Sequence, residues 1–546
     1  MPLFPFLGKD DFWESGNLPA PWSSERPSIY RFIQSNLRGQ DHGLPDEAQD
    51  LPDEALVREV QSMGWVAGGL DGAFQHHAEG GNDRARAEAL YKVLSEALSK
   101  GTEKNLKTLY ELLRQDQLID FIDPLIEVII EEGRTDRTLP ADRLHRLARW
   151  LALEAPDRGP VKFGIAMLGL VELEDTDDRP LFQTLGRHEE FTLYAVVSIL
   201  GRYEDAEREL FDLAKHVNGW GRIQIVERFS ETQDPEIKAW LLREGFRNSV
   251  MYEYLAHTAA TAGGLLQELK ASDPDEDLLK GAGEILKALT SGGPAEDMDD
   301  YSEGAEATKL YLQHLDSRAT ELNDFLVAKA LYEFAANTEA DWDSRKANGW
   351  TAEHREAVLR LSGGIIARSE WREKAMSGLA GEDETAFWQA RQVAEALGID
   401  TWEHSFRRQV SGAGDEWFFL MQTEDLRRID RVLQLAEDTI PLQEIATGPA
   451  EELGLGEDFT HHSAVDFIVQ DLGRFPGKGW KLIEAALKSP VIRNRNMAMK
   501  ALSDWGRERW PADARRVVEE AYRIVPDEEV KADLGRLKEG SPLGQD

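Results

Sequence analysis

The stretch HVNGWGRIQIVERF, residues 216–229, joins a tryptophan flanked by two glycines to an apolar helical pattern. Ile225, Val226 and Phe229 recur at three- and four-residue spacing, which places them on one face of a helix. We expect Asn218 to cap the N-terminus of this helix, because an asparagine side chain accepts hydrogen bonds from the first helical N–H groups. The stretch is therefore predicted to be a structural joint that opens a short helix.

The same pattern recurs along the chain with a period of 29 residues. Each copy contains a second helix, and in the copy that holds the joint this helix is predicted to begin at Asp234-Pro235, with aspartate as the cap and proline in the first helical position. The apolar groups that align in the first helices are Met167-Leu168 with Val171, Val196-Val197 with Leu200, and Ile225-Val226 with Phe229. Those of the second helices are Leu181-Phe182, Leu210-Phe211 and Ala239-Trp240. Helix pairs of about 30 residues cannot bury their apolar faces alone, so the pattern predicts a stacked superhelix.

A second block of short helices lies near the C-terminus. Its segment SPVIRNRNMAMKAL, residues 489–502, begins at a Ser-Pro pair and continues with helical spacing, and Pro511 and Pro526 mark two more helix starts. Short helix pairs with a proline at the turn and an Arg- and Asn-rich first helical turn resemble HEAT repeats. The resemblance implies an all-α, HEAT-like α-solenoid and gives no indication of activity.

Four segments also resemble stretches of a family of bacterial HEAT-like proteins. They are GGLDGAFQHH (68–77), NGWGRIQIVERF (218–229), DPEIKAWLLREG (234–245) and SPVIRNRNMAMKAL (489–502). Some members of that family carry the label limonene hydroxylase, which implies a monooxygenase. The residues here do not favour that activity, because the chain lacks cysteine, has no Glu-x-x-His pair and has no Gly-x-Gly-x-x-Gly motif after a strand.

Composition limits the other functional classes. The chain has 546 residues, and 63 Lys and Arg against 101 Asp and Glu give a formal charge of -38, which repels nucleic acids and anionic membranes. No segment approaches the ~18 consecutive apolar residues of a membrane span, and the N-terminus lacks a signal-peptide pattern. We therefore expect a cytoplasmic protein that is a monomer or a small homo-oligomer.

Breaks in the helical pattern predict five segments. They are an irregular N-terminal arm (1–55) that drapes over the first helices, N-terminal HEAT-like repeats (56–265), a helical middle region with acidic loops (266–450), C-terminal HEAT-like repeats (451–538) and a flexible tail (539–546). We expect the stack to continue through the middle region.

Two histidine doublets lie near carboxylates and are the candidate metal-binding residues. The candidates are Asp71, His76, His77, His461 and His462. Histidine and carboxylate side chains bind Zn, Mn or Fe, so a divalent metal is the one cofactor that the sequence suggests. Adjacent histidines on a helix point about 100° apart, so each doublet offers one ligand to a given site. The competing interpretation is that these residues form caps and hydrogen bonds between repeats.

Four side chains are the candidates for partner binding: Trp220, Arg222, Arg493 and Arg495. Tryptophan and arginine are enriched at protein interfaces, and solenoids bind peptides or proteins on their concave face. Trp220 also has a structural interpretation as a wedge between repeats. The two C-terminal arginines could instead face phosphates, as in HEAT-like DNA glycosylases, or form a ladder between helix pairs.

These observations predict a protein-interaction scaffold or adaptor that binds a protein or peptide partner. The alternative is an enzyme with a His and carboxylate site, including the limonene-hydroxylase type. A DNA-binding or glycosylase function is the third interpretation, and the net charge disfavours it.

Overall fold

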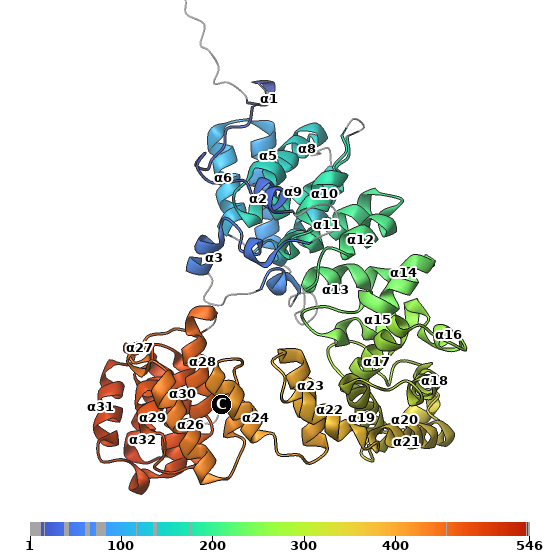
Figure 1. Ribbon diagram of the computed structural model, residues 1–546. Coiled ribbons are helices and arrows are strands. Elements are labelled where there is room, and N and C mark those ends of the chain that lie inside the picture. The colour runs from blue at the N-terminus through green and yellow to red at the C-terminus, as the bar shows by residue number, and fades with distance from the viewer. Residues whose placement is uncertain are drawn as a thin grey trace, which may run out of the picture. The chain divides into compact units, whose positions relative to one another are not determined.

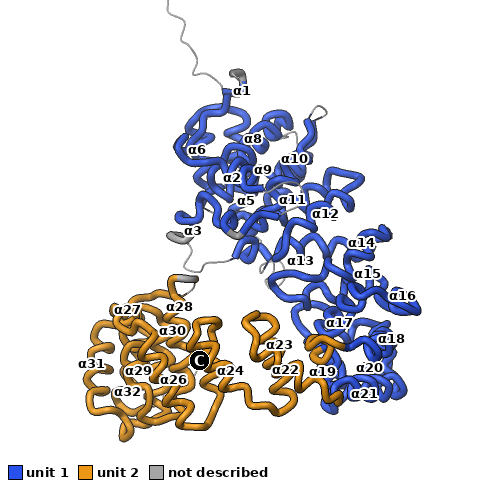
Figure 2. Tube along the Cα trace, in the orientation of Figure 1, with its two compact units in different colours: residues 1–61, 65–319, 327–366 blue, residues 62–64, 320–326, 367–546 orange. Residues whose placement is uncertain are grey.

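The computed structural model describes residues 12–15, 17–37, 43–60, 66–72, 83–115, 117–134, 139–173, 176–454, 456–541 and 543. The chain divides into two compact units (Figure 2). Unit 1 comprises residues 1–61, 65–319 and 327–366, and unit 2 comprises residues 62–64, 320–326 and 367–546. The division falls inside the middle region predicted for 266–450.

The helices of unit 1 are α1 (Phe12–Ser15), α2 (Ile29–Asn36), η1 (Asp46–Ala48), α3 (Glu54–Val60), α5 (Arg84–Ser99), α6 (Glu103–Gln115), η2 (Leu118–Asp120), α7 (Ile122–Gly133), α8 (Ala141–Glu154), α9 (Arg158–Leu170), α10 (Arg179–Leu185), α11 (Glu189–Arg202), α12 (Ala206–Ala214), α13 (Trp220–Val226), η3 (Glu227–Phe229), α14 (Pro235–Trp240), the π-helix η4 (Leu241–Gly245), η5 (Tyr252–Tyr254), α15 (Ala256–Gly263), α16 (Leu265–Leu269), α17 (Glu276–Ser291), α18 (Gly304–Asp316), α20 (Trp342–Ala347) and α21 (Ala352–Ile366).

Helix α19 (Leu322–Ala336) has residues in both units. The helices of unit 2 are α22 (Glu370–Gly378), α23 (Glu384–Ala396), α24 (Trp402–Ser411), α25 (Trp417–Met421), α26 (Leu426–Thr439), α27 (Leu442–Ile445), η6 (Glu457–Phe459), α28 (Thr460–Val469), η7 (Leu472–Arg474), α29 (Trp480–Leu487), α30 (Ile492–Trp505), η8 (Arg507–Arg509), α31 (Ala514–Ile524) and α32 (Glu528–Glu539).

The described part of the chain contains helices and no β-strand, and its β-type pairing is an isolated bridge between Glu452 and Val491. The predicted all-α class is confirmed for these residues. None of their helices combines the length and the apolar character needed to cross a membrane.

Helices α8 to α13 form the part of unit 1 that positions the site described below (Figure 1). Helix α9 packs between α8 and α11, α11 packs on α13, and α10 and α12 cover the same group of helices. Small residues allow the close approach of α9 and α11, because a Cβ atom on Gly169 would lie 2.5 Å from Ser198 Oγ. Each of these helices therefore packs on helices that are near it in the chain.

The register inside the repeat differs from the prediction. Helices α9, α11 and α13 begin at Arg158, Glu189 and Trp220, which are 31 residues apart, and not 29. A shift of two residues turns a position about 200° around a helix. Val197 and Leu200, which were predicted to be buried with their counterparts, are therefore 53% and 44% exposed.

The start of α13 also differs from the prediction. Gly219, and not Asn218, is the N-cap residue, and no side chain of the cap bonds to the helix. The acceptor comes from the previous repeat instead, because the Glu189 carboxylate accepts hydrogen bonds from the N–H groups of Asn218 at 2.9 Å and Gly221 at 3.3 Å. The predicted start of α14 is confirmed: Asp234 caps Glu236 and Pro235 is the first helical residue.

The described N-terminal segments pack on α8, α9 and α11. Ile29 donates its N–H to Ala155 O at 3.1 Å, and Arg26 pairs with Asp157 at 2.6 Å. Further along, Lys162 Nζ lies 2.7 Å from Asp71 Oδ2 and 2.6 Å from Glu190 Oε1. Polar contacts thus attach the described segments that contain Arg26, Ile29 and Asp71 to the ends of the helices.

Candidate functional site

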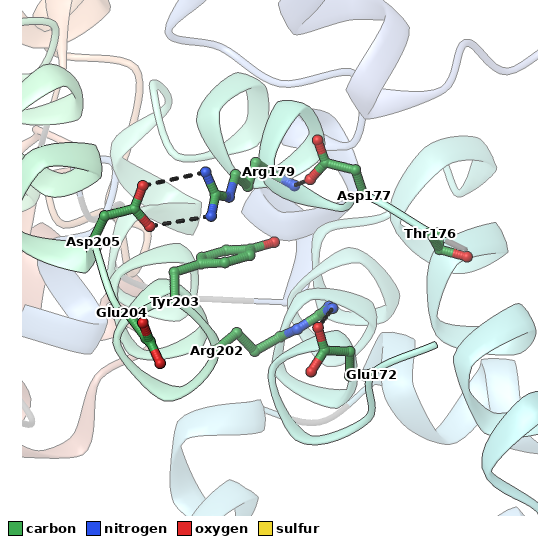
Figure 3. Close-up of a pocket in the computed structure, with 8 residues that line it drawn as sticks. All are labelled: Glu172, Thr176, Asp177, Arg179, Arg202, Tyr203, Glu204 and Asp205. Atoms are coloured by element: carbon green, nitrogen blue, oxygen red, sulfur yellow. Dashed lines mark hydrogen bonds and ion pairs between the residues drawn. The ribbon is translucent and has the colours of Figure 1, made fainter. Parts of the chain in front are cut away.

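A pocket of about 790 Å³ lies in unit 1, where the loop after α9 meets the loop that joins α11 to α12 (Figure 3). Eight residues line it: Glu172, Thr176, Asp177, Arg179, Arg202, Tyr203, Glu204 and Asp205. Its volume lies in the range of ligand pockets, but its lining is polar and charged, whereas small-molecule pockets are mostly apolar.

Two arginines enclose the ring of Tyr203 in this pocket. The guanidinium carbon of Arg179 lies 4.4 Å from the centroid of the ring, and that of Arg202 lies 5.6 Å from it. Figure 3 shows Tyr203 between the two arginines, and we call these three residues the Arg–Tyr–Arg stack. Cations over an aromatic face are attracted by the ring quadrupole, so the three side chains hold one another in place.

A buried carboxylate behind the pocket positions Arg202. Asp178 is fully buried, and its Oδ2 accepts hydrogen bonds from Arg202 at 2.7 Å and from His145 Nε2 at 2.9 Å. Arg149 also bonds to this carboxylate. Burial alone would raise the pKa of Asp178, but the bonds from Arg202 and His145 outweigh it and lower the pKa. Asp178 is therefore a fixed anion that neutralises Arg202.

Carboxylates at the pocket edge neutralise Arg179 in the same way. Its guanidinium donates to Asp205 at 3.1 Å and 3.3 Å and lies 3.5 Å from Glu209. Its backbone N–H donates to Asp177 Oδ1 at 3.0 Å. Both cations of the Arg–Tyr–Arg stack are thus already paired within the protein.

Several polar groups of the pocket have no such partner. Within the described residues, neither Asp177 nor Glu204 forms an ion pair, and both are exposed. The Tyr203 hydroxyl and Arg202 Nε are buried and accept or donate no hydrogen bond among the described groups. Burial also raises the pKa of Tyr203, which stays neutral. The pocket thus offers two unpaired carboxylates and one unpaired hydroxyl.

The buried His145 behind the pocket is not free to act as a general base. A nucleophile needs a general base within hydrogen-bond reach, and the nearby His145 is buried with its Nε2 on Asp178. The described lining contains no serine, lysine or histidine. Its groups can hold a ligand by charge and hydrogen bonds without acting as a base.

Two described members of the predicted metal-binding set contact other side chains. Asp71 is buried against Lys162, and His76 and His77 lie outside the described residues. His461 is exposed, and His462 Nδ1 lies 2.9 Å from Asn494 Oδ1 and 3.0 Å from Ser489 Oγ. In the described part of the chain, no group of three or more histidine and acidic side chains is placed to hold a metal ion.

The predicted partner-binding residues differ in exposure. Trp220 is 9% exposed and its ring lies 5.2 Å from that of Tyr254. Arg222 donates to Val217 O at 2.8 Å and to Arg247 O at 3.0 Å, so it links α13 to the turn after η4.

The two C-terminal candidates behave differently from each other. Arg495 is 1% exposed and donates to three backbone carbonyls, those of Ser489, Pro490 and Ala450. Arg493 is the exposed member of the set, with 56% of its side chain accessible and Asp466 at 3.5 Å. Trp220 and Arg495 are thus interior side chains in this structure.

Sequence reasoning missed the Arg–Tyr–Arg stack. The segment GRYED, residues 201–205, ends one predicted helix and begins the next, and it places an arginine, a tyrosine and two carboxylates in a loop. Arg179 and its partner Asp205 are 26 residues apart, which is close to one repeat.

No protein-family model matches this chain, and no curated protein matches it. Among solved structures, the crystal structure of an engineered protein aligns with 83% of this chain and 98% of that chain, at 16% sequence identity and with a TM-score of 0.21. A likeness of this degree carries no argument about fold or function.

Proposed function

We propose that this protein is a HEAT-like α-solenoid that works as a protein-interaction scaffold, and that unit 1 binds a segment of its partner at the pocket of the Arg–Tyr–Arg stack. The observation that carries the proposal is an open pocket with two exposed carboxylates that form no ion pair among the described residues, at the ends of helices that carry exposed apolar side chains. The equal spacing of the starts of α9, α11 and α13 supports the solenoid.

The apolar part of the surface lies at the C-terminal ends of α9 and α11. Leu170, Val197 and Leu200 are 41%, 53% and 44% exposed. Both helices lead directly into the pocket, because Glu172 follows α9 and Arg202 ends α11. Apolar side chains rimmed by polar groups are typical of protein-binding surfaces. A peptide that crosses the helix ends would contact the apolar side chains and the pocket together.

A peptide-display selection on the immobilised full-length protein tests the proposal. We expect selected peptides to bind the Val197→Ser/Leu200→Ser variant at least about tenfold more weakly, because each substitution removes an apolar contact of about 1 kcal/mol. The matched control is Val410→Ser/Leu426→Ser, since these residues of unit 2 are 56% and 53% exposed. A selection that yields no peptide, or peptides that are equally sensitive to both variants, would reject the proposed surface.

A further inference from the structure

We propose that the pocket of the Arg–Tyr–Arg stack recognises a cationic side chain, a lysine or arginine, in a basic segment of the partner. This inference rests on the proposed function and names the chemistry of the partner at that site. It follows from the charges that remain in the pocket after the internal ion pairs are formed.

The first step concerns the two arginines. Arg202 is paired with Asp178, and its side chain is only 4% exposed. Arg179 is paired with Asp205 and Glu209. An incoming carboxylate or phosphate would have to displace these partners, and the buried Arg202 Nε is out of its reach. The arginines therefore do not form an anion site.

The second step concerns the carboxylates. Asp177 and Glu204 have no cationic partner among the described residues, and Glu172 is 70% exposed and 3.7 Å from Arg202. These three carboxylates border the pocket, so its uncompensated charge is negative. An ammonium or guanidinium group is attracted to such a border, and more strongly where it is partly removed from water.

The third step concerns the tyrosine. Both faces of its ring are covered by the arginines, so the ring offers no face for stacking. The Tyr203 hydroxyl is as buried as Arg202 Nε, so the pocket presents neither group to a ligand. The groups that face a ligand are therefore the carboxylates at the border of the pocket.

The fourth step distinguishes an organic cation from a metal ion. A divalent cation needs several oxygen ligands that converge at about 2.0–2.6 Å. No such group of acidic side chains is found in the described residues. A long flexible lysine or arginine side chain needs no such convergence of ligands. Leu170, Val197 and Leu200 can pack against apolar side chains that neighbour the lysine or arginine in the partner.

The test uses a fluorescently labelled peptide of alternating leucine and lysine, titrated with the full-length protein and followed by anisotropy. We expect Asp177→Asn/Glu204→Gln to weaken binding about tenfold, and the same peptide with acetylated lysines to bind no better to the native protein than to this variant. Tyr203→Phe keeps the carboxylates at the border and removes only a buried hydroxyl, so we expect it to change binding less than twofold.

The net charge of the whole chain attracts any basic peptide, so the control must change that charge equally. Asp277→Asn/Glu268→Gln does so at exposed carboxylates of unit 1 that form no ion pair among the described residues. We expect less than a twofold effect from this control. Equal weakening by the two double variants would overturn the inference and leave the proposed function intact. Displacement of the peptide by calcium, abolished only by the pocket variant, would overturn it in favour of a metal ion. Failure of the proposed function is a separate result, the absence of surface-dependent peptides from the display selection.

Discussion

The two ends of helices α9 and α11 carry charged clusters of similar composition and opposite character. At the N-terminal ends, Arg158 and Lys162 of α9 meet Glu190 of α11 and two carboxylates of the N-terminal segments, Asp53 and Asp71. We call these five residues the anchor cluster. At the C-terminal ends lies the pocket of the Arg–Tyr–Arg stack. Both clusters combine basic side chains with carboxylates at the ends of the same two helices.

The two clusters differ in how many of their charged side chains form ion pairs within the protein. In the anchor cluster, burial opposes the charge on Lys162, but Asp71 and Glu190 outweigh it and raise the pKa of the lysine. Burial likewise opposes the charge on Glu190, but Lys162 and Arg158 lower its pKa to about 2. These charges hold the N-terminal segments in place. In the pocket, Asp177 and Glu204 form no ion pair among the described residues. A buried cluster whose charged side chains all form ion pairs is structural, whereas an open cluster with exposed carboxylates outside any ion pair can bind.

The largest effect is expected from the removal of the buried cation. Lys162→Met leaves Asp71 and Glu190 buried side by side, and we expect the free energy of unfolding of unit 1 to fall by about 3–5 kcal/mol. Denaturant unfolding followed by circular dichroism measures the loss. The methionine fills a similar volume, so the loss reports charge and not a cavity.

Lys500→Met is the matched control for that experiment. Lys500 pairs with Asp504 at 2.9 Å, four residues along α30, but its side chain is 60% exposed. Exposed pairs of this kind contribute about 0.3–0.5 kcal/mol. If the two variants lost similar amounts of stability, the anchor cluster would not differ in kind from a surface ion pair, and the comparison would fail.

A second, somewhat smaller effect depends on pH and involves His188 at the start of α11. Its Nδ1 accepts from the Glu190 N–H at 3.2 Å, and its Nε2 donates to Gln49 O at 3.0 Å. Both ring nitrogens are thus satisfied in the neutral form. Burial lowers the pKa of His188 from 6.5 to about 4, against the influence of the Gln49 carbonyl and Glu190.

The sign of the pH effect follows from these pKa values. Between pH 6.5 and about 4 the unfolded chain binds a proton at His188 and the folded chain does not, so stability falls as the pH falls. Above pH 6.5 both states are neutral and this histidine has no effect. The shift corresponds to a loss of about 3 kcal/mol over this range.

His188→Asn isolates this contribution. Asparagine can still cap α11 but does not titrate, so the difference in stability between native protein and variant should shrink as the pH falls from about 7 to about 4.5. Denaturant unfolding at several pH values measures it. Parallel pH profiles for the two proteins would show that His188 does not take up a proton on unfolding. The histidine would then make no contribution to the pH dependence of stability.

The helical class of the described residues could be read from the sequence, but the register of the helices could not. Periodic apolar residues and Asp234-Pro235 were sufficient for short helices, because capping and amphipathicity are local properties. The predicted register was wrong at Val197 and Leu200, because a two-residue difference in the spacing of helix starts turns the opposite side of a helix inward. The residue at which a helix starts sets this register. The N-terminus of α13 is capped by Glu189, at the start of α11, and not by a neighbouring residue.

The candidate site was less predictable for the same reason. Asp71 was selected as a metal ligand beside histidines that are close in sequence, whereas its partner Lys162 lies 91 residues away. Such a pairing leaves no local pattern. The residues of the Arg–Tyr–Arg stack come from adjacent repeats, and no single segment displays them together. Val197 and Leu200 were visible in the sequence as apolar positions, but only the structure shows that they are exposed.

The smallest effect is the one that separates binding from stability in the pocket itself. Tyr203→Phe removes a buried hydroxyl that has no hydrogen-bond partner among the described groups, so we expect the free energy of unfolding to rise by about 1 kcal/mol while binding of the basic peptide changes less than twofold. Tyr110→Phe is the counterpart, because the Tyr110 hydroxyl donates to the buried Asp157, and its loss should destabilise unit 1 by about 1–2 kcal/mol. Denaturant unfolding of both variants shows whether each substitution raises or lowers the free energy of unfolding.

A destabilised Tyr203→Phe variant would mean that the hydroxyl supports the fold, as that of Tyr110 does. Opposite signs would instead mean that the chain retains a group that costs stability at the place where the partner binds, which is the trade-off expected of a functional site.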